Sequence, residues 1–468
     1  MITAFASRTN IDTSTAIKAN FALLHRAVSQ FDPRFSLRVL RSISSVRKQL
    51  SANLLVQIIA ETISTSGSVQ KKFLELTENE NSPSKDGAVE MEVDSKPSSK
   101  NSTSPKESLP EVDIYLAILC QVYFFDQKDF ENGARFSDSV VEQLRTLNRR
   151  TLDSLAARAY FYYSLFYEHI APLPPSPASA VISIRQHLLA ALRTATLRKD
   201  QDIQATVTAL LLRNYLSTSH ISQADLLLSH TRFPPEASNN QIARYLYYQG
   251  RIRAIQLAYS DAHKHLISAT RKAPTSYTAS GFYQASTKLL VVVELLMGDI
   301  PDRSIFRQPS LERSMPPYLE IVQAVNAGGL ENFNSLVQKH NAIFRRDGTY
   351  TLILRLRQNV IKTGIRTMSL SYSRIRLRDI VLRLGLQSEE SAEYVVGKAI
   401  RDGVIEATLD HAHGYMKSKE IGDVYATQEP RNVFHDRIQA CLALHDESVK
   451  VCSLPFLTWS RESCISKG

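Results

Sequence analysis

The chain has few cysteines and no arrangement that would bring them together. Cys120, Cys441, Cys452 and Cys464 are scattered through 468 residues without a Cys-x-x-Cys pair. Disulfide frameworks and cysteine-ligated zinc sites depend on regular cysteine spacing, so the sequence argues against both. We therefore expect the protein in a reducing compartment.

Long apolar runs are also missing. The longest candidate, residues 289–297, is far shorter than the run of about 20 residues that a membrane-spanning helix needs. The N-terminal residues show no basic stretch followed by a continuous apolar segment, so no secretory signal is predicted. We expect a protein of the cytoplasm and nucleus that has no membrane partner.

The common signatures of nucleotide and hydrolase sites do not occur. The chain has no Walker-type phosphate loop, no Gly-x-Gly-x-x-Gly after a strand and no Gly-x-Ser-x-Gly elbow. These loops bring backbone amides to a phosphate or expose a nucleophilic serine, so the chemistry that depends on them is excluded. We predict no catalytic, cofactor-binding or metal-ligating residues, and a chain that is not an enzyme.

One group of side chains invites a metal interpretation. His411 and His413 are followed by Asp423, a pattern that is similar to the zinc ligands of isopeptidases of the JAMM class. That motif also requires a serine and a second aspartate at places that Ile421 and Val424 occupy here. A zinc isopeptidase is therefore disfavoured.

Glycine and proline are sparse, at 16 and 18 residues, while 43% of the residues are hydrophobic. This composition favours a mostly α architecture. A chain of this length exceeds what one hydrophobic core usually supports, so we expect several domains or an extended array.

Composition and periodicity divide the chain into five parts. Residues 77–109 are rich in Ser, Glu, Asp, Lys and Pro, and they bury too little apolar surface to offset the entropy of ordering, which predicts a disordered linker. The predicted domains are an N-terminal helical region at 1–76, this acidic and Ser-rich linker, a helical-repeat array at 110–345, a module at 346–420 that contains a winged helix at 372–420, and a C-terminal helix and tail at 421–468.

Helical periodicity dominates the array. Segments of helical pattern alternate with short breaks, as in residues 113–125, 134–147, 152–169, 182–197, 203–216, 289–297, 318–325, 330–340 and 350–368. Residues 246–274 place small and apolar side chains at the offsets of a tetratricopeptide (TPR) repeat, with Pro274 ending the second helix. An ordinary helical hairpin is the alternative, and either unit predicts stacked helix pairs in a solenoid.

The segment 372–420 has the pattern of a winged helix. A helix with Leu377, Ile380 and Leu384 on one face precedes Gly385, and Ser388 is placed to cap a second helix. Val404–Leu409 then has strand-like composition, and His413-Gly414 turns the chain into a second strand at 415–418. A helix over 431–451 follows.

Such a module either binds nucleic acid or docks a protein. The net charge of +10 suits phosphates or an acidic protein, and residues 345–383 are strongly basic. The second helix, however, begins with Glu389 and Glu390, which would repel phosphates. A short hairpin with a free edge instead favours strand pairing with a neighbouring subunit. A nucleic-acid-binding winged helix remains the alternative function.

The order of helical repeats and winged helix resembles the PCI family, the scaffold subunits of the proteasome lid, the COP9 signalosome and translation initiation factor eIF-three. Five sequence runs carry a closer likeness to a PCI subunit of the proteasome regulatory particle lid, over about residues 110–451. These runs are residues 148–153, 160–165, 211–216, 298–306 and 398–403.

The resemblance implies a TPR-like/PCI solenoid followed by a winged helix and a C-terminal helix, in a non-catalytic scaffold without cofactors. It also implies a hetero-oligomer with other PCI and MPN subunits of the lid, and places partner contacts in two segments. The winged-helix strands would contribute Val404, Ile405, Glu406, Ala407, Thr408, Leu409 and Tyr415, and the C-terminal helix Phe434, Ile438 and Leu442. For the last three, an intramolecular core is the competing interpretation. The tail after Val451 departs from the family pattern.

Overall fold

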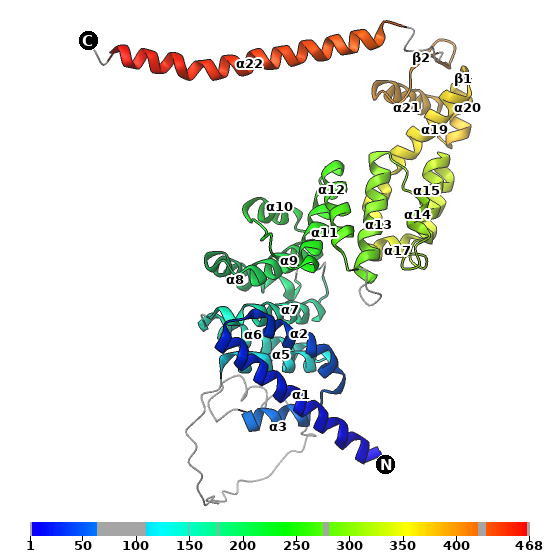
Figure 1. Ribbon diagram of the computed structural model, residues 1–468. Coiled ribbons are helices and arrows are strands. Elements are labelled where there is room, and N and C mark those ends of the chain that lie inside the picture. The colour runs from blue at the N-terminus through cyan, green and yellow to red at the C-terminus, as the bar shows by residue number, and fades with distance from the viewer. Residues whose placement is uncertain are drawn as a thin grey trace, which may run out of the picture. The chain divides into compact units, whose positions relative to one another are not determined.

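Helices build most of the described residues in the computed structural model, which describes residues 2–62, 109–147, 149–174, 176, 178–274, 280–419 and 427–465 (Figure 1). The predicted mostly α fold is confirmed, with one small sheet. The predicted linker at 77–109 lies outside the described residues except for Leu109. By its internal contacts the chain forms two compact units, residues 1–322 with 340–356 and residues 323–339 with 357–468.

The first unit begins with helices that place one apolar face inward. Its first elements are α1 (Ile2–Gln30), α2 (Pro33–Val46), η1 (Arg47–Gln49) and α3 (Ala52–Thr62). Ile17, Phe21 and Leu24 on α1 are buried, as their helical spacing predicts. Asp32 accepts a hydrogen bond from Arg34 N at 2.9 Å and caps α2, whose first residue is Pro33.

Antiparallel helix pairs then stack side by side (Figure 1). In chain order the elements are α5 (Pro110–Gln127), α6 (Phe130–Thr146), η2 (Arg150–Leu152), α7 (Asp153–His169), η3 (Ala180–Ile182), α8 (Arg185–Arg198), α9 (Gln201–Ser217), α10 (Ile221–His230), α11 (Asn239–Ile255), α12 (Tyr259–Lys272) and α13 (Ser280–Met297). Helices α5, α7 and α9 are buried along much of their length, because each has neighbours on several sides.

The predicted repeat at 246–274 corresponds to α11 and α12. A Cβ on Gly250 would lie 2.8 Å from Cγ of Leu266, which is fully buried. Glycine thus permits the close approach of the two helices that the repeat pattern predicts.

Shorter helices follow, α14 (Arg303–Phe306), α15 (Pro316–Ala327), α16 (Leu330–Lys339), α17 (Asn341–Asp347), α18 (Tyr350–Arg355) and α19 (Arg357–Ser371). The prediction of one helix over 350–368 is wrong, because the chain breaks at Leu356. There the Leu356 amide bonds to Ile353 O at 3.0 Å, the spacing of a tight turn. The side chain of Leu356 is fully buried, so tertiary packing holds this break without a glycine or proline.

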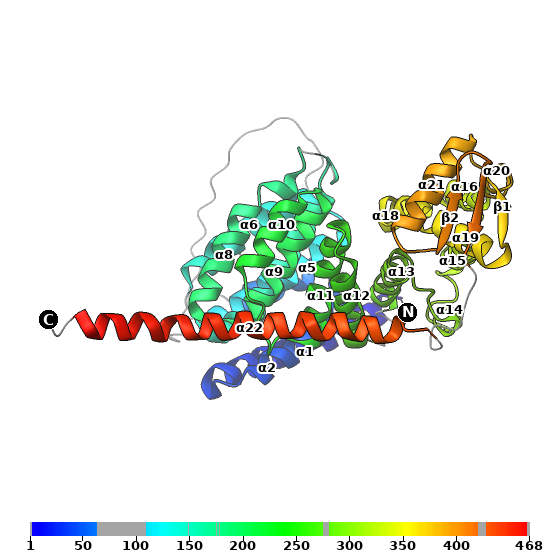
Figure 2. The same ribbon diagram turned by 90° about the horizontal axis from the view of Figure 1, so that it is seen from above.

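The second unit contains the winged helix (Figure 2). Besides α16 and α19, this unit contains β1 (Arg374–Arg376), α20 (Leu377–Leu384), α21 (Glu389–Arg401), β2 (Ala407–Asp410), β3 (Tyr415–Ser418) and α22 (Glu429–Ile465). The sheet order is β1-β3-β2, with both pairs antiparallel. One core joins the sheet to α19, α20 and α21 through Ile365, Ile375, Ile380, Val396 and Met416.

Candidate docking surfaces

The helices of the winged helix begin and end where the sequence indicates. Gly385 adopts φ 64° directly after α20, a conformation that glycine reaches without the penalty of a Cβ. Ser388 Oγ accepts a hydrogen bond from Ser391 N at 3.2 Å and caps α21. One apolar face of α21 points inward, with Ala392, Val396 and Ala399 buried. Local sequence signals therefore position the two helices that support the sheet.

The predicted strand at Val404–Leu409 divides into two parts. β2 includes only Ala407, Thr408 and Leu409 of the predicted residues, and Val404 to Glu406 lead into it. Ile405 belongs to the core at 6% exposure. Val404, Ala407 and Leu409 are half-buried against the same core, whereas Glu406 and Thr408 are exposed.

The register of β2 decides which of its main-chain groups are free. Lys419 N donates to Glu406 O at 3.0 Å, and Thr408 lies opposite Lys417. In an antiparallel ladder the residues that face the partner alternate with residues that point away. The amides and carbonyls of Ala407 and Leu409 therefore point away from β3, at an edge that no other described strand covers.

The predicted contact residues of the C-terminal helix are exposed. Phe434, Ile438 and Leu442 have exposed fractions of 63%, 57% and 57%, and they recur every fourth residue along α22. The described part of the chain thus provides no intramolecular core for them. Exposed apolar side chains in line on a helix are typical of a surface that a partner covers.

A third strand was missed by sequence reasoning. β1 consists of Arg374, Ile375 and Arg376, with Ile375 buried and both arginines exposed. Alternation over three residues is too short a signal to predict a strand. The segment becomes a strand because β3 pairs with it.

The histidines of the hairpin have carboxylate partners of their own. His411 Nδ1 lies 2.7 Å from Glu393 Oε1, and His413 Nδ1 lies 2.9 Å from Asp410 Oδ2. The hydrogen bonds with His413 lower the pKa of the Asp410 carboxyl. Asp423 lies outside the described residues, and among the described ones no three side chains are grouped as metal ligands.

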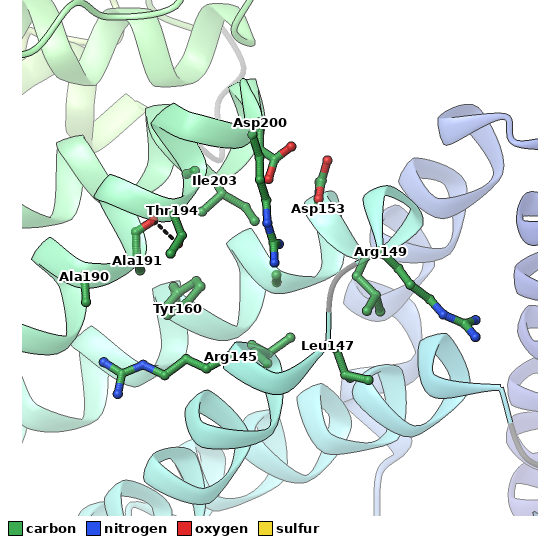
Figure 3. A pocket seen from close by; sticks show the side chains of 15 residues that line it. Arg145, Leu147, Arg149, Asp153, Tyr160, Ala190, Ala191, Thr194, Asp200 and Ile203 are labelled. Atoms are coloured by element: carbon green, nitrogen blue, oxygen red, sulfur yellow. Dashed lines mark hydrogen bonds between the residues drawn. The ribbon is translucent and has the colours of Figure 1, made fainter.

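A cavity of about 340 Å³ lies among α6, α7, α8 and α9 in the first unit (Figure 3). Its lining is mostly apolar, with Ala191, Ala195 and Ile203 on the α8 and α9 side. The carboxyl groups of Asp153 and Asp200 lie close to each other at one side (Figure 3). Burial and the charge of Asp200 raise the pKa of Asp153 to about 7. We attribute no chemistry to this pair.

None of the described helices combines the length and the apolar character that crossing a membrane requires.

Three family models match the chain. "PSMD3-like, N-terminal TPR repeats" covers residues 9–322 and "PCI domain" covers 337–420. A third model, for the C-terminal region of a proteasome regulatory subunit, covers 423–453. Most of the array thus falls within the first model, the winged helix within the second and part of α22 within the third.

Curated relatives match over nearly the whole chain. The probable 26S proteasome regulatory subunit rpn3 of Schizosaccharomyces pombe is 47% identical over 94% of this chain and 85% of its own length. A probable 26S proteasome non-ATPase regulatory subunit 3 from Anopheles gambiae is 45% identical, over 94% and 85%. The 26S proteasome non-ATPase regulatory subunit 3 of Dictyostelium discoideum is 40% identical, over 95% and 86%. The expected likeness to a PCI subunit of the proteasome regulatory particle is confirmed, and the chain belongs to the family of 26S proteasome non-ATPase regulatory subunit 3.

Proposed function

We propose that this chain is a scaffold subunit in the lid of the 19S regulatory particle, where it supports ATP-dependent degradation of ubiquitinated proteins by the 26S proteasome. The observation that carries this function is the order of a TPR-like array, a PCI winged helix and a C-terminal helix, matched throughout by models and relatives of one proteasomal subunit family. Membership in a family of non-ATPase regulatory subunits agrees with the expected absence of catalysis.

The partners in this proposal are other PCI and MPN subunits of the lid. The edge of β2 would pair with a neighbouring subunit through the free main-chain groups of Ala407 and Leu409, assisted by Glu406, Thr408 and Tyr415. The apolar line Phe434, Ile438 and Leu442 of α22 would pack in a helical bundle. In the described chain the apolar line of α22 is exposed, and the outer main-chain groups of β2 pair with no other strand.

The cytoplasm and nucleus are the proposed locations, since the family's complex is the proteasome and no described helix could span a membrane. The nucleic-acid alternative has no comparable support. α21 begins with exposed Glu389 and Glu390, and Glu393 of the same helix pairs with His411. Carboxylates at this position oppose the phosphates of a duplex.

Affinity purification of the tagged full-length chain from cell extract tests the proposal. We expect stoichiometric recovery of proteasome ATPase and deubiquitinase subunits, identified by mass spectrometry, and comigration in a sedimentation gradient. Recovery of the free chain alone would sink the assignment.

Two variants test the proposed surfaces separately. Ala407→Pro removes an outward amide from β2, where an edge strand tolerates proline, and should reduce recovery of neighbouring subunits. Joint replacement of Phe434, Ile438 and Leu442 by alanine should release the chain from the bundle. Asp436→Ala with Glu447→Ala, exposed polar positions of α22, is the matched control and should assemble normally.

A further inference from the structure

The opposite edge of the sheet, at β1, is also free and has a different chemistry. Leu377 N donates to Gly414 O at 2.9 Å, and Ser418 N donates to Ser373 O at 2.9 Å. Residues 373, 375 and 377 therefore face β3, and the amides and carbonyls of Arg374 and Arg376 point away from it. Among the described residues no strand pairs with this side of β1.

An open cleft of about 680 Å³ lies along this edge. Its walls come from the segment 372–376, from α20 and from the β2–β3 hairpin. The residues that line it are Tyr372, Arg374, Ile375, Arg376, Asp379, Leu382, Arg383, His413 and Tyr415. The cleft is thus lined by three arginines, Arg374, Arg376 and Arg383, and by a single carboxylate, that of Asp379.

Aromatic rings hold two of these arginines in place. The guanidinium carbon of Arg374 lies 4.5 Å from the centre of the Tyr415 ring, and that of Arg383 lies 4.8 Å from the Tyr372 ring. Arg383 also donates to Tyr372 Oη at 2.5 Å. Stacking leaves the N–H groups at the guanidinium rim available for a carboxylate.

The positive charge of the cleft is only partly offset, because Asp379 supplies the one carboxylate among the lining residues. No ion pair joins Arg374, Arg376 or Arg383 to a carboxylate among the described residues, and all three side chains are exposed. Leu382 is 74% exposed on the α20 side of the cleft, so an apolar surface adjoins the charged one.

We propose that the β1 edge binds an extended acidic segment of a partner protein, which adds to the sheet as a further strand. Its main chain pairs with Arg374 and Arg376, and its Asp or Glu side chains meet the three arginines. Successive side chains of a strand alternate between faces, so the carboxylates occupy every second position on the face of Arg374 and Tyr415. The intervening apolar side chains lie on the opposite face, toward Leu382.

This inference goes beyond the proposed function, because it concerns β1 and a charged partner rather than β2 and the bundle helix. A chain with two free edges of different chemistry can distinguish two neighbours. A variant that loses the contact at β1 keeps the contacts at β2 and α22, so the proposal for β1 and the proposed function can be tested separately.

Fluorescence anisotropy with the purified full-length chain tests the inference. The probe is a fluorescein-labelled peptide of alternating glutamate and valine, and the comparison peptides carry glutamine for glutamate or gather all glutamates in one block. We expect the alternating acidic peptide to bind more tightly than both, with an affinity that falls as salt rises. Joint Arg374→Gln and Arg376→Gln should weaken binding by about tenfold. Arg366→Gln, at an exposed position of α19, is the matched control and should leave it unchanged.

The main-chain contribution has its own comparison. Arg376 has φ −75°, which suits proline, so Arg376→Pro removes the outward amide as well as the charge, whereas Arg376→Gln removes the charge alone. We expect weaker binding to the proline variant. Hydrogen exchange of the wild-type chain is an independent readout, in which the peptide should protect the Arg374 and Arg376 amides.

Several results would overturn the inference. If the block and alternating peptides bind with equal affinity and neither protects these amides, the binding is nonspecific electrostatic attraction and no strand is added to the sheet. If the arginine substitutions leave the affinity for the peptide unchanged, the peptide binds at another site. Duplex DNA is the third comparison. If it binds more tightly than the peptide, and if the same substitutions weaken its binding, this surface binds nucleic-acid phosphates and not an acidic peptide.

Discussion

At the scale of single residues, Asp153 and Asp200 place two carboxyl groups side by side in the helical array. Asp200 stands at the N-cap of α9 but makes no capping hydrogen bond through its side chain, and it is only 4% exposed. Its carboxyl group lies beside that of Asp153 at the start of α7 (Figure 3). The negative charge of Asp200 favours the protonated form of Asp153, because two negative charges side by side repel each other.

The raised pKa of Asp153 predicts a pH dependence of stability. The pKa of Asp153 in the folded chain is about 7, raised by burial first and then by Asp200, and it lies above the usual value for an aspartate. Between these two pKa values the folded state binds more protons than the unfolded state, so the stability of the first unit should fall as pH rises from about 4 to about 7. Urea unfolding followed by circular dichroism at several pH values measures this dependence.

Asp153→Asn tests the origin of that dependence. The variant keeps a hydrogen-bonding group but removes one titrating charge, so its urea midpoint should decline less between pH 5 and 8 than that of the wild type. Asp261→Asn, at an exposed carboxylate of α12, is the control and should follow the wild type. An undiminished decline in Asp153→Asn would contradict the role of the pair.

At the scale of an element, the winged helix depends on the inward face of α21. Val396 is fully buried between α20 and the sheet, whereas Tyr394 on the same helix is 72% exposed. Val396→Asp would place an unpaired charge in this core and should cost about 3–5 kcal/mol. Hydrogen exchange should then show early loss of protection in α20, α21 and β3, while Tyr394→Asp should leave protection intact. Unchanged protection in Val396→Asp would refute this account of the core.

The elements also show how far local sequence reaches. α20, α21 and β3 were predicted nearly as they occur, because Gly385, Ser388 and Gly414 mark their ends. β1 was not predicted, because three alternating residues form a strand only beside a partner. The strand predicted at Val404–Leu409 starts three residues before β2 does. The free edges follow from the hydrogen-bond register, which residue patterns do not contain.

At the scale of the whole molecule, α22 is a long helix whose described side chains up to Val451 are exposed apart from the half-buried Pro430. An isolated helix with little tertiary contact opens readily, because packing supplies most of the stability of helices. In the purified chain we expect the amides of α22 around Phe434 and Leu442 to exchange rapidly. In the purified proteasome they should be protected by about a hundredfold or more if the helix is packed in a bundle. Equal exchange in the free and assembled chain would be evidence against the proposed bundle contact.

The amino-acid sequence by itself determined the helical array, the winged-helix order and the family, because helix periodicity, capping residues and sequence runs such as residues 298–306 are local features. The candidate contact residues were also chosen from sequence, and they remain a prediction. Only the tertiary structure decided that the helix predicted at 350–368 breaks at Leu356, that β1 exists, and that Arg374 and Arg376 point their main chain outward. These features depend on which segments pack or pair across the fold. Such contacts join residues that are distant in the sequence, so no local periodic pattern predicts them.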